Sequence, residues 1–271
     1  MREFISSFFT YPFMMRALVV GVLISGCAAA LGVPLVLKRY SMIGDGLSHV
    51  AFGALAIATA LGFAPMIFTI PVVILTAFLL LRLGESGKIK GDAAIALIST
   101  GALAIGVTAV SLSKGMNTDV YNYMFGSVLS MNESDVTLSI ILASAVLVLF
   151  LLFYNRIFAV TFDESFLKAA GVKTAAYNIL ISFLTAITVV VGMRVMGSLL
   201  ISALIIFPTM TSMRVFKTFR SVVISSLVCS VASFLIGFYL SFSYDMPTGA
   251  SIVIVNIILF LVFSLIGKVK R

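Results

Sequence analysis

Asp45 and His49 are the residues of this sequence best suited to do chemistry. They lie in the apolar stretch GDGLSHVAFGALAIATALG (residues 44–62), and His49 is the one histidine of the chain. On an α-helix, residues four apart share one face, one turn from each other, so a carboxylate and an imidazole would converge there. Such oxygen and nitrogen donors suit a divalent ion, zinc or manganese. We therefore predict that Asp45 and His49 form half of a metal site.

This pair does not complete a site by itself. A tetrahedral ion takes four ligands, and the sequence offers no second histidine or cysteine pair to complete it. A two-fold symmetric homodimer would supply Asp45 and His49 twice, at the dimer axis. The same two side chains could instead form a structural hydrogen bond between helices, or serve a proton relay. The residues alone leave all three interpretations open.

The composition indicates where this pair is placed. Hydrophobic residues make up 61% of the 271-residue chain and charged residues 10%, whereas soluble domains are roughly a quarter charged. Long apolar windows recur, each suited to a bilayer core of about 30 Å. We predict one all-α, polytopic transmembrane domain (1–271) with eight to nine spans, eight if one tightly joined pair is a single bent element. The windows are 17–37, 44–63, 64–81, 93–113, 136–153, 175–193, 195–213, 221–244 and 246–267.

The basic residues predict an orientation in the membrane. The net charge is +8, but Lys and Arg are spread over short loops, which indicates orientation by the positive-inside rule rather than nucleic-acid binding. With nine spans the main basic groups share one side, the cytoplasm, so we expect the N-terminus outside and the C-terminus inside. Segment 114–135 is semi-polar and is predicted to be re-entrant or interfacial. The basic groups are Lys38 and Arg39; Arg82, Lys88 and Lys90; Arg156, Lys168 and Lys173; Arg214, Lys217 and Arg220; and Lys268, Lys270 and Arg271.

The stretch KRYSMIGDGLSH (38–49) resembles the most distinctive segment of the metal-cation ABC importer permeases of the ZnuB/MntB type, in which a basic, Ser-containing turn precedes an I-G/S-D-x-L-S-H core. The similarity continues in order along nearly the whole chain. Its motifs are specific for the family and not for the metal. The other similar stretches are YNYMFGSVLSM (121–131), LLFYNRIFAVTFDESFLKAAGV (151–172), GSLLISALIIFPTMTSMRV (197–215) and DMPTGASIVIV (245–255).

The resemblance implies a homodimeric permease of the metal-chelate or metal-ion fold in a bacterial inner membrane. It implies partners too: two copies of a separate ATPase on the cytoplasmic face and an extracellular metal-binding protein. It also implies that Asp45 and His49 are the metal ligands. The transported ion would be Zn²⁺, or next Mn²⁺, moved by alternating access, with no permanently bound cofactor.

Residues 161–172 are predicted to be a cytoplasmic helix. Thr161 or Asp163 could cap it, with Phe166, Leu167 and Ala170 on one face. The resemblance implies that this segment couples the permease to the ATPase; without it, a helix lying on the bilayer surface is an equal alternative. The residues assigned to coupling are Phe162, Asp163, Phe166, Leu167, Ala170 and Gly171.

No G-x-x-x-x-G-K-[ST] motif occurs, and GESGKIKG (84–91) has the wrong spacing. The chain is therefore not predicted to be an ATPase, and the energy for transport must come from another chain or from a gradient. A gradient-driven transporter or channel using the same Asp–His pair is the first alternative. An intramembrane hydrolase lacks HExxH, and a non-transporting scaffold would tolerate Asn and Gln at the pair.

Three further residues have weaker functional interpretations. Arg194 and Met196 lie at a tight turn expected outside, where they could form an outer gate over the metal path. Pro208 removes a backbone hydrogen bond and is expected to kink its span, either for gating or for packing alone. Cys27 and Cys229 lie in apolar spans and are expected to be small buried hydrophobes.

Overall fold

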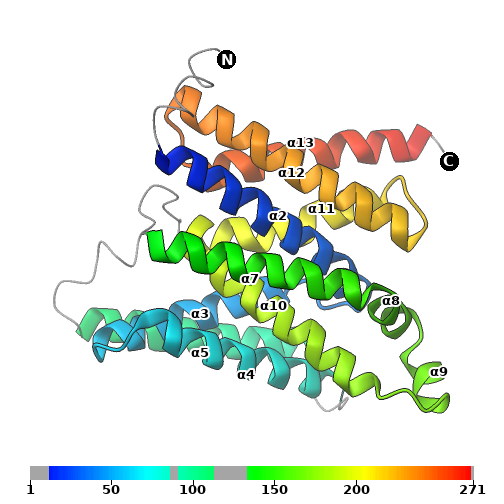
Figure 1. The fold of residues 1–271 in the computed structure, drawn as a ribbon, viewed down its shortest axis with the longest axis horizontal. Coiled ribbons are helices and arrows are strands. Elements are labelled where there is room, and N and C mark those ends of the chain that lie inside the picture. The colour runs from blue at the N-terminus through cyan, green and yellow to red at the C-terminus, as the bar shows by residue number, and fades with distance from the viewer. Residues whose placement is uncertain (1–11, 86–90, 113–132, 270–271) are drawn as a thin grey trace.

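A computed structural model describes residues 12–85, 91–112 and 133–269, and all elements of these residues are helices (Figure 1). The all-α prediction is confirmed. Cys27 and Cys229 are buried and unpaired. The helices are α2 (Pro12–Leu37), α3 (Ile43–Ala60), α4 (Pro65–Glu85), α5 (Gly91–Leu112), α7 (Glu133–Leu152), α8 (Tyr154–Phe162), α9 (Glu164–Ala169), α10 (Thr174–Met196), α11 (Ser198–Met213), α12 (Phe219–Tyr244) and α13 (Thr248–Val269).

Each predicted apolar window corresponds to one helix, but fewer of these helices qualify as membrane spans than the sequence predicts. Among the described residues, six are long and apolar enough to cross a membrane. A seventh is added if α7 and α8, bent by 68° at their junction, form one span. Two apolar stretches are shorter, Pro65–Leu80 and Ser198–Met213. The eight to nine predicted spans are reached only if these two also cross. Most of segment 114–135 lies outside the described residues; its end, from Glu133, begins α7.

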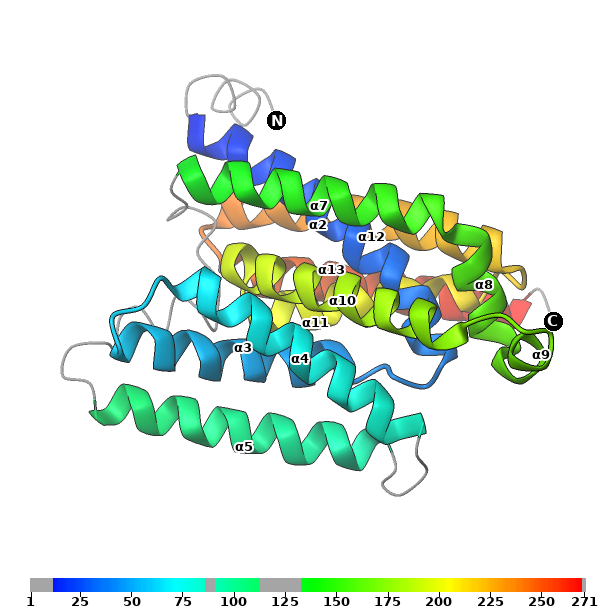
Figure 2. The same cartoon turned by 60° about the horizontal axis from the view of Figure 1, so that its bottom comes forward.

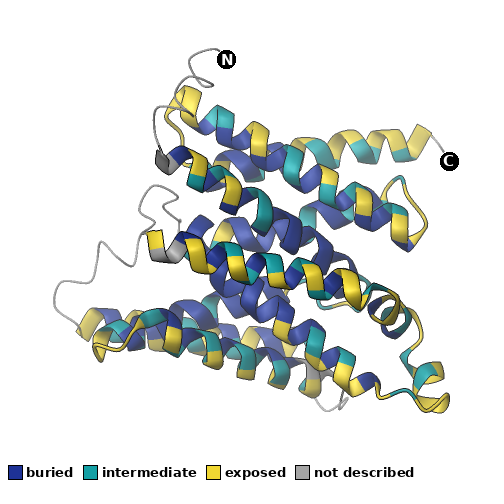
Figure 3. Ribbon diagram, in the orientation of Figure 1, coloured by how far each residue is buried: buried dark blue, intermediate teal, exposed yellow. Residues whose placement is uncertain are grey.

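The centre of the bundle is formed by α10 and α11 (Figure 3). Helix α11 packs against α2, α3, α10, α12 and α13, while α3 packs mainly against α4 and α5. Figure 2 shows α3, α4 and α5 together on one side of the molecule. The outer faces of α5, α7 and α13 are exposed and apolar, as expected for helices that contact lipid.

The join between α10 and α11 is at Gly197, where φ is +88°. An L side chain is strained in this left-handed region, so glycine suits the break. The sequence placed this join near residue 194; the structure instead continues α10 to Met196, and Arg194 lies in its last turn.

Basic residues gather at one end of the bundle. The C-terminal ends of α2, α4 and α13, the α8–α9 segment and the α11–α12 turn all lie at that end (Figures 1 and 2). These elements carry Lys38, Arg82, Lys168, Lys217 and Lys268. The arrangement agrees with the predicted grouping of charge, and the cytoplasmic assignment of this end stays a prediction. We refer to it below as the basic end.

Candidate functional site

Asp45 and His49 lie on the same face of α3, as their spacing predicts. His49 Nε2 is 3.6 Å from Asp45 Oδ2, which is too long for a hydrogen bond. Neither side chain has a hydrogen-bond partner among the described residues. The Asp45 side chain is 43% exposed and that of His49 27%, although most of α3 is buried. The pair is thus a partly exposed polar face on a helix that is mostly buried, and among the described residues it forms no structural hydrogen bond.

Close packing on both sides holds this part of α3. A Cβ added at Gly44 would lie 2.8 Å from Ile205 Cδ1 of α11, and one added at Gly46 would lie 2.6 Å from Ile95 Cγ2 of α5. Real Cβ atoms almost never come that close, so the two glycines let α11 and α5 approach the backbone beside Asp45. Both neighbours are apolar, which leaves the Asp–His face as the polar side of this turn.

The start of α3 lies at the basic end of the bundle, where α2 turns into it (Figure 2). Arg39 in this turn has φ +64°, and the Ile43 amide donates to the Tyr40 carbonyl at 3.0 Å. The pair therefore lies in the first two turns of α3, directly after the turn formed by residues 38–42.

The predicted helix 161–172 is divided in the structure. Thr161 lies in the last turn of α8, and its hydroxyl donates to the Ile157 carbonyl at 2.6 Å, so it is not the cap. Asp163 is the cap: its carboxylate accepts from the Phe166 amide at 2.8 Å. The helix that follows, α9, runs only from Glu164 to Ala169. It ends there because Gly171, with φ +80°, turns the chain toward α10.

The residues that the resemblance assigns to coupling form an exposed knob at the basic end. Phe162 and Phe166 are exposed, as are Asp163, Ala170 and Gly171, whereas Leu167 is half-buried. Phe162 packs against Phe158 and Phe219, at 4.9 and 6.0 Å between ring centroids. The knob thus presents apolar side chains outward and is supported from behind by aromatic rings.

A polar cluster anchors α9 to the rest of the molecule, and the sequence reasoning missed it. Glu164 accepts hydrogen bonds from Lys168 of the same helix at 2.8 Å and from Asn178 of α10 at 3.1 Å. Lys38, one residue beyond α2, reaches it at 3.2 Å. Thr174 adds a weak contact at 3.5 Å. From the sequence, Lys38 is interpreted as an orientation charge and as part of the basic turn of the family motif. The signal for the cluster is the polar Asn178 near the start of an apolar span.

These donors change the acidity of Glu164. Burial alone would raise the pKa of its carboxyl. Hydrogen bonds from Lys168 and Asn178 and the positive charge of Lys38 outweigh burial and lower the pKa from 4.5 to about 2. The carboxylate is thus held in its charged form over the physiological pH range.

We expect this cluster to make stability fall with acid. In the unfolded chain Glu164 takes up a proton near pH 4.5, while in the folded chain it stays ionised down to about pH 2. Its contribution is therefore fully present above pH 4.5 and is lost as the pH falls toward 2. Circular dichroism melting of the wild type and Glu164→Gln should show a difference in Tm at pH 6 that shrinks progressively below about pH 4.5. A difference that does not change with pH would contradict the assignment.

Arg194 and Met196 are not brought to the Asp–His pair. Both lie in the last turn of α10, at the end of the bundle away from α9, whereas α3 begins at the basic end (Figure 1). Met196 is buried and Arg194 half-buried. A gate formed by these two residues stays a prediction, and it would act at a distance from the pair.

Pro208 is buried within α11, which is continuous from Ser198 to Met213. Its carbonyl accepts from the Ser226 hydroxyl of α12 at 3.3 Å. Ile205, which packs on Gly44, lies one turn before it. Pro208 thus lies close to the contact between α11 and α3. The predicted kink, and its role in gating or in packing, stay predictions.

Known proteins of similar sequence match nearly the whole chain. The chain is 27% identical over 270 residues to the manganese import system permease protein ScaB of Streptococcus gordonii, covering 100% of this chain and 97% of that one. It is 28% identical over 250 residues to the high-affinity zinc uptake system membrane protein ZnuB of Haemophilus influenzae, covering 92% and 96%.

Solved structures share the whole fold. PsaBC from Streptococcus pneumoniae, in complex with Fab, superposes with a TM-score of 0.87 at 26% identity, covering 100% of this chain and 99% of that one. An inward-facing structure described as a metal-chelate type ABC transporter gives 0.73 at 20% identity, covering 92% and 84%, and supports the fold alone. The profile of the ABC 3 transport family matches residues 10–267. The chain therefore belongs to the ABC 3 transport family, which confirms the resemblance seen in its sequence.

Proposed function

We propose that this chain is the transmembrane permease subunit of an ATP-binding cassette importer that moves Zn²⁺, or next Mn²⁺, into the cytoplasm as a homodimer. The observation that carries the proposal is the geometry of Asp45 and His49 in a chain of this family. Relatives are named for manganese and for zinc, so the family supports a divalent ion and the donor set must decide between the two.

The distance within the pair suits two ligands of one ion. Zinc takes oxygen and nitrogen ligands at about 2.0–2.2 Å in tetrahedral geometry, so two of its ligands are about 3.3–3.5 Å apart. Asp45 Oδ2 and His49 Nε2 are 3.6 Å apart, within the reach of a small side-chain adjustment. Two such pairs across a two-fold axis would give a closed set of two oxygens and two nitrogens. Because imidazole nitrogen suits zinc somewhat better than manganese, we place zinc first.

The Glu164 cluster provides a path from the ATPase to this site. In the proposed mechanism, closure of two partner ATPases pushes on the knob at α9. The Glu164–Lys38 ion pair passes that displacement to the α2–α3 turn, and α3 carries the pair. One ion pair and one turn of five residues, 38–42, thus separate the coupling segment from the helix that holds the metal.

Uptake into proteoliposomes tests this proposal. Vesicles contain the permease with or without its ATPase, and the metal-binding protein is supplied on the opposite side with radioactive zinc or manganese. We expect uptake that requires both ATPase and ATP and survives collapse of the proton gradient. The metal that competes better at equal concentration is the substrate. Uptake by the permease alone, abolished by a protonophore, would instead establish the gradient-driven transporter.

A further inference from the structure

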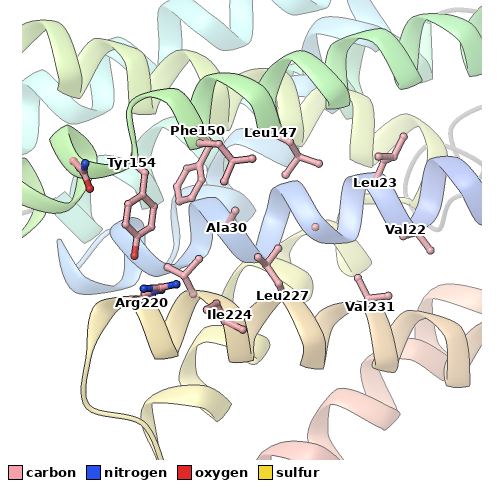
Figure 4. Close-up of a pocket in the computed structure, with 14 residues that line it drawn as sticks. Val22, Leu23, Ala30, Leu147, Phe150, Tyr154, Arg220, Ile224, Leu227 and Val231 are labelled. Carbon is pink, nitrogen blue, oxygen red and sulfur yellow. The ribbon is translucent and has the colours of Figure 1, made fainter.

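A groove of about 630 Å³ on the outside of the bundle has no role in the proposed transport path. Helix α2 forms its floor, at Gly26 and Ala30, and α7 and α12 form its two walls, at residues such as Leu147 and Leu227 (Figure 4). The helices that α3 packs against most are α4 and α5, neither of which borders this groove. It is therefore separate from the Asp–His pair.

The groove is apolar along its length and polar at one end. Its lining is aliphatic or aromatic except near the start of α12, where Tyr154, Asn155 and Arg220 contribute to it. In Figure 4 the hydroxyl of Tyr154 points toward the guanidinium of Arg220 across this end. Arg220 is exposed, and it makes no salt bridge within the described part of the chain. The Arg220 guanidinium and the Tyr154 hydroxyl thus lie at one end of an otherwise apolar groove.

The length and position of the groove match one leaflet of a bilayer. From Arg220 to Val231 along α12 is eleven residues, or about 16 Å at 1.5 Å per residue, roughly half of a 30 Å hydrocarbon core. The floor and one wall belong to helices that can span a membrane, Met14–Leu37 of α2 and Phe219–Tyr244 of α12. Arg220 follows the α11–α12 turn at the basic end, so the polar end is at headgroup level and the apolar end near the middle of the bilayer.

We propose that this groove binds one anionic phospholipid of the inner leaflet in each protomer, with an acyl chain along α2 and the headgroup phosphate on Arg220. Guanidinium pairs with phosphate through two parallel hydrogen bonds, and the Tyr154 hydroxyl is a further donor. Anionic lipid is attracted to the basic face of a membrane protein. A protein partner fits less well, because the apolar length of the groove lies at hydrocarbon depth.

The bound lipid would stabilise the packing of α8, the helix that precedes the coupling segment. Phe219, next to Arg220, is buried and contacts the rings of Tyr154 at 5.4 Å and Phe158 at 5.1 Å. It also contacts Phe162, the last residue before the α9 cap. A lipid held between Arg220 and Tyr154 therefore braces α8 against α12, just before the knob that the ATPase is proposed to push.

Binding of lipid to the purified full-length permease tests this without metal or ATPase, so the result is independent of the transport proposal. Native mass spectrometry counts bound dioctanoyl phosphatidylglycerol against dioctanoyl phosphatidylcholine. We expect one phosphatidylglycerol per protomer, and we expect Arg220→Gln to weaken its binding about tenfold, the loss expected for one charge-assisted contact. Arg220→Lys should keep part of it. Lys217→Gln is the matched control, an exposed cation in the same turn that does not line the groove.

Gly26→Leu tests the apolar part of the groove. A Cβ at Gly26 meets only Leu227 and Leu147, at 3.9 and 4.0 Å, so the backbone tolerates a side chain and a longer one fills the groove. We expect it to lose binding of both lipids. Equal weakening by Lys217→Gln, no preference for phosphatidylglycerol, or unchanged binding in Gly26→Leu would each overturn the proposal. Loss of ATPase binding in Arg220→Gln, with lipid binding unchanged, would assign the polar end to the partner instead.

Discussion

Asp45→Asn and His49→Gln should each reduce ATP-driven metal uptake by at least about 100-fold, because losing even an outer-shell partner of a metal ligand costs 10–100-fold in affinity. Asn and Gln keep the size of the side chains but replace a charged oxygen or an imidazole nitrogen with a weak amide donor. Uptake into proteoliposomes with the partner ATPase and binding protein measures the effect. Zinc and manganese should both be affected, since both would use the same donors.

Stability should hardly change in these variants. Both side chains are partly exposed and make no hydrogen bond with described residues, so we expect shifts within about 0.5 kcal/mol. The thiols of Cys27 and Cys229 are buried, and a thiol-reactive fluorophore therefore reports unfolding in this tryptophan-free chain. Thr59→Val is the matched control: it lies on the same helix, and its hydroxyl donates to the Leu55 carbonyl at 2.8 Å within that helix. Full uptake in folded Asp45→Asn and His49→Gln would show that the pair is not the transport site.

A mixed dimer tests whether the two copies share one site. Wild-type and Asp45→Asn chains carrying different tags can be co-expressed, and the mixed dimer isolated by both tags in turn. If four ligands from two protomers hold one ion, one altered protomer removes a ligand from the shared site. Uptake should then fall nearly as far as in a dimer in which both protomers carry Asp45→Asn. Retention of half the wild-type uptake would mean that each protomer transports by itself.

We expect Lys38→Gln to uncouple ATP hydrolysis from uptake and Lys168→Gln to leave the two coupled. Both lysines pair with Glu164, but only Lys38 connects α9 to the turn that leads into α3. We expect Lys38→Gln to lower the metal transported per ATP about tenfold, within the range of typical coupling energies. Uptake and phosphate release, measured on the same vesicles, give this ratio directly. Equal ratios in the two variants would contradict transmission through Lys38.

The two lysines also differ in their expected contribution to stability. The Lys38 side chain is 11% exposed. Removing its charge deprives the Glu164 carboxylate of one donor at a site shielded from water, which should lower the free energy of unfolding by about 1–3 kcal/mol. That of Lys168 is 57% exposed and lies in an i,i+4 surface pair, worth about 0.5 kcal/mol or less. Thermal unfolding of both variants, still bound to the ATPase, separates loss of coupling from loss of folding.

The sequence by itself determined the features that depend on local rules. Uninterrupted apolar runs specify helices at the predicted windows, because a backbone in lipid must satisfy its own hydrogen bonds. The 3.6-residue period puts Asp45 and His49 on one face whatever surrounds them. The order of motifs along the chain was enough to place it in its family. The Asp163 cap was one of two candidates, since Thr161 and Asp163 both have a suitable oxygen.

Only the tertiary structure decided which distant residues meet. Lys38 and Glu164 are 126 positions apart, and their ion pair exists because α2 ends where α9 and α10 begin. A bend of 68° between α7 and α8 separates α8 from the span before it. Nothing in the sequence around Phe153 predicts this bend. The groove between α7 and α12 arises because both pack on α2 without filling the space beside Gly26. Such features depend on how whole helices pack, and packing is a sum over contacts that no short stretch of sequence contains.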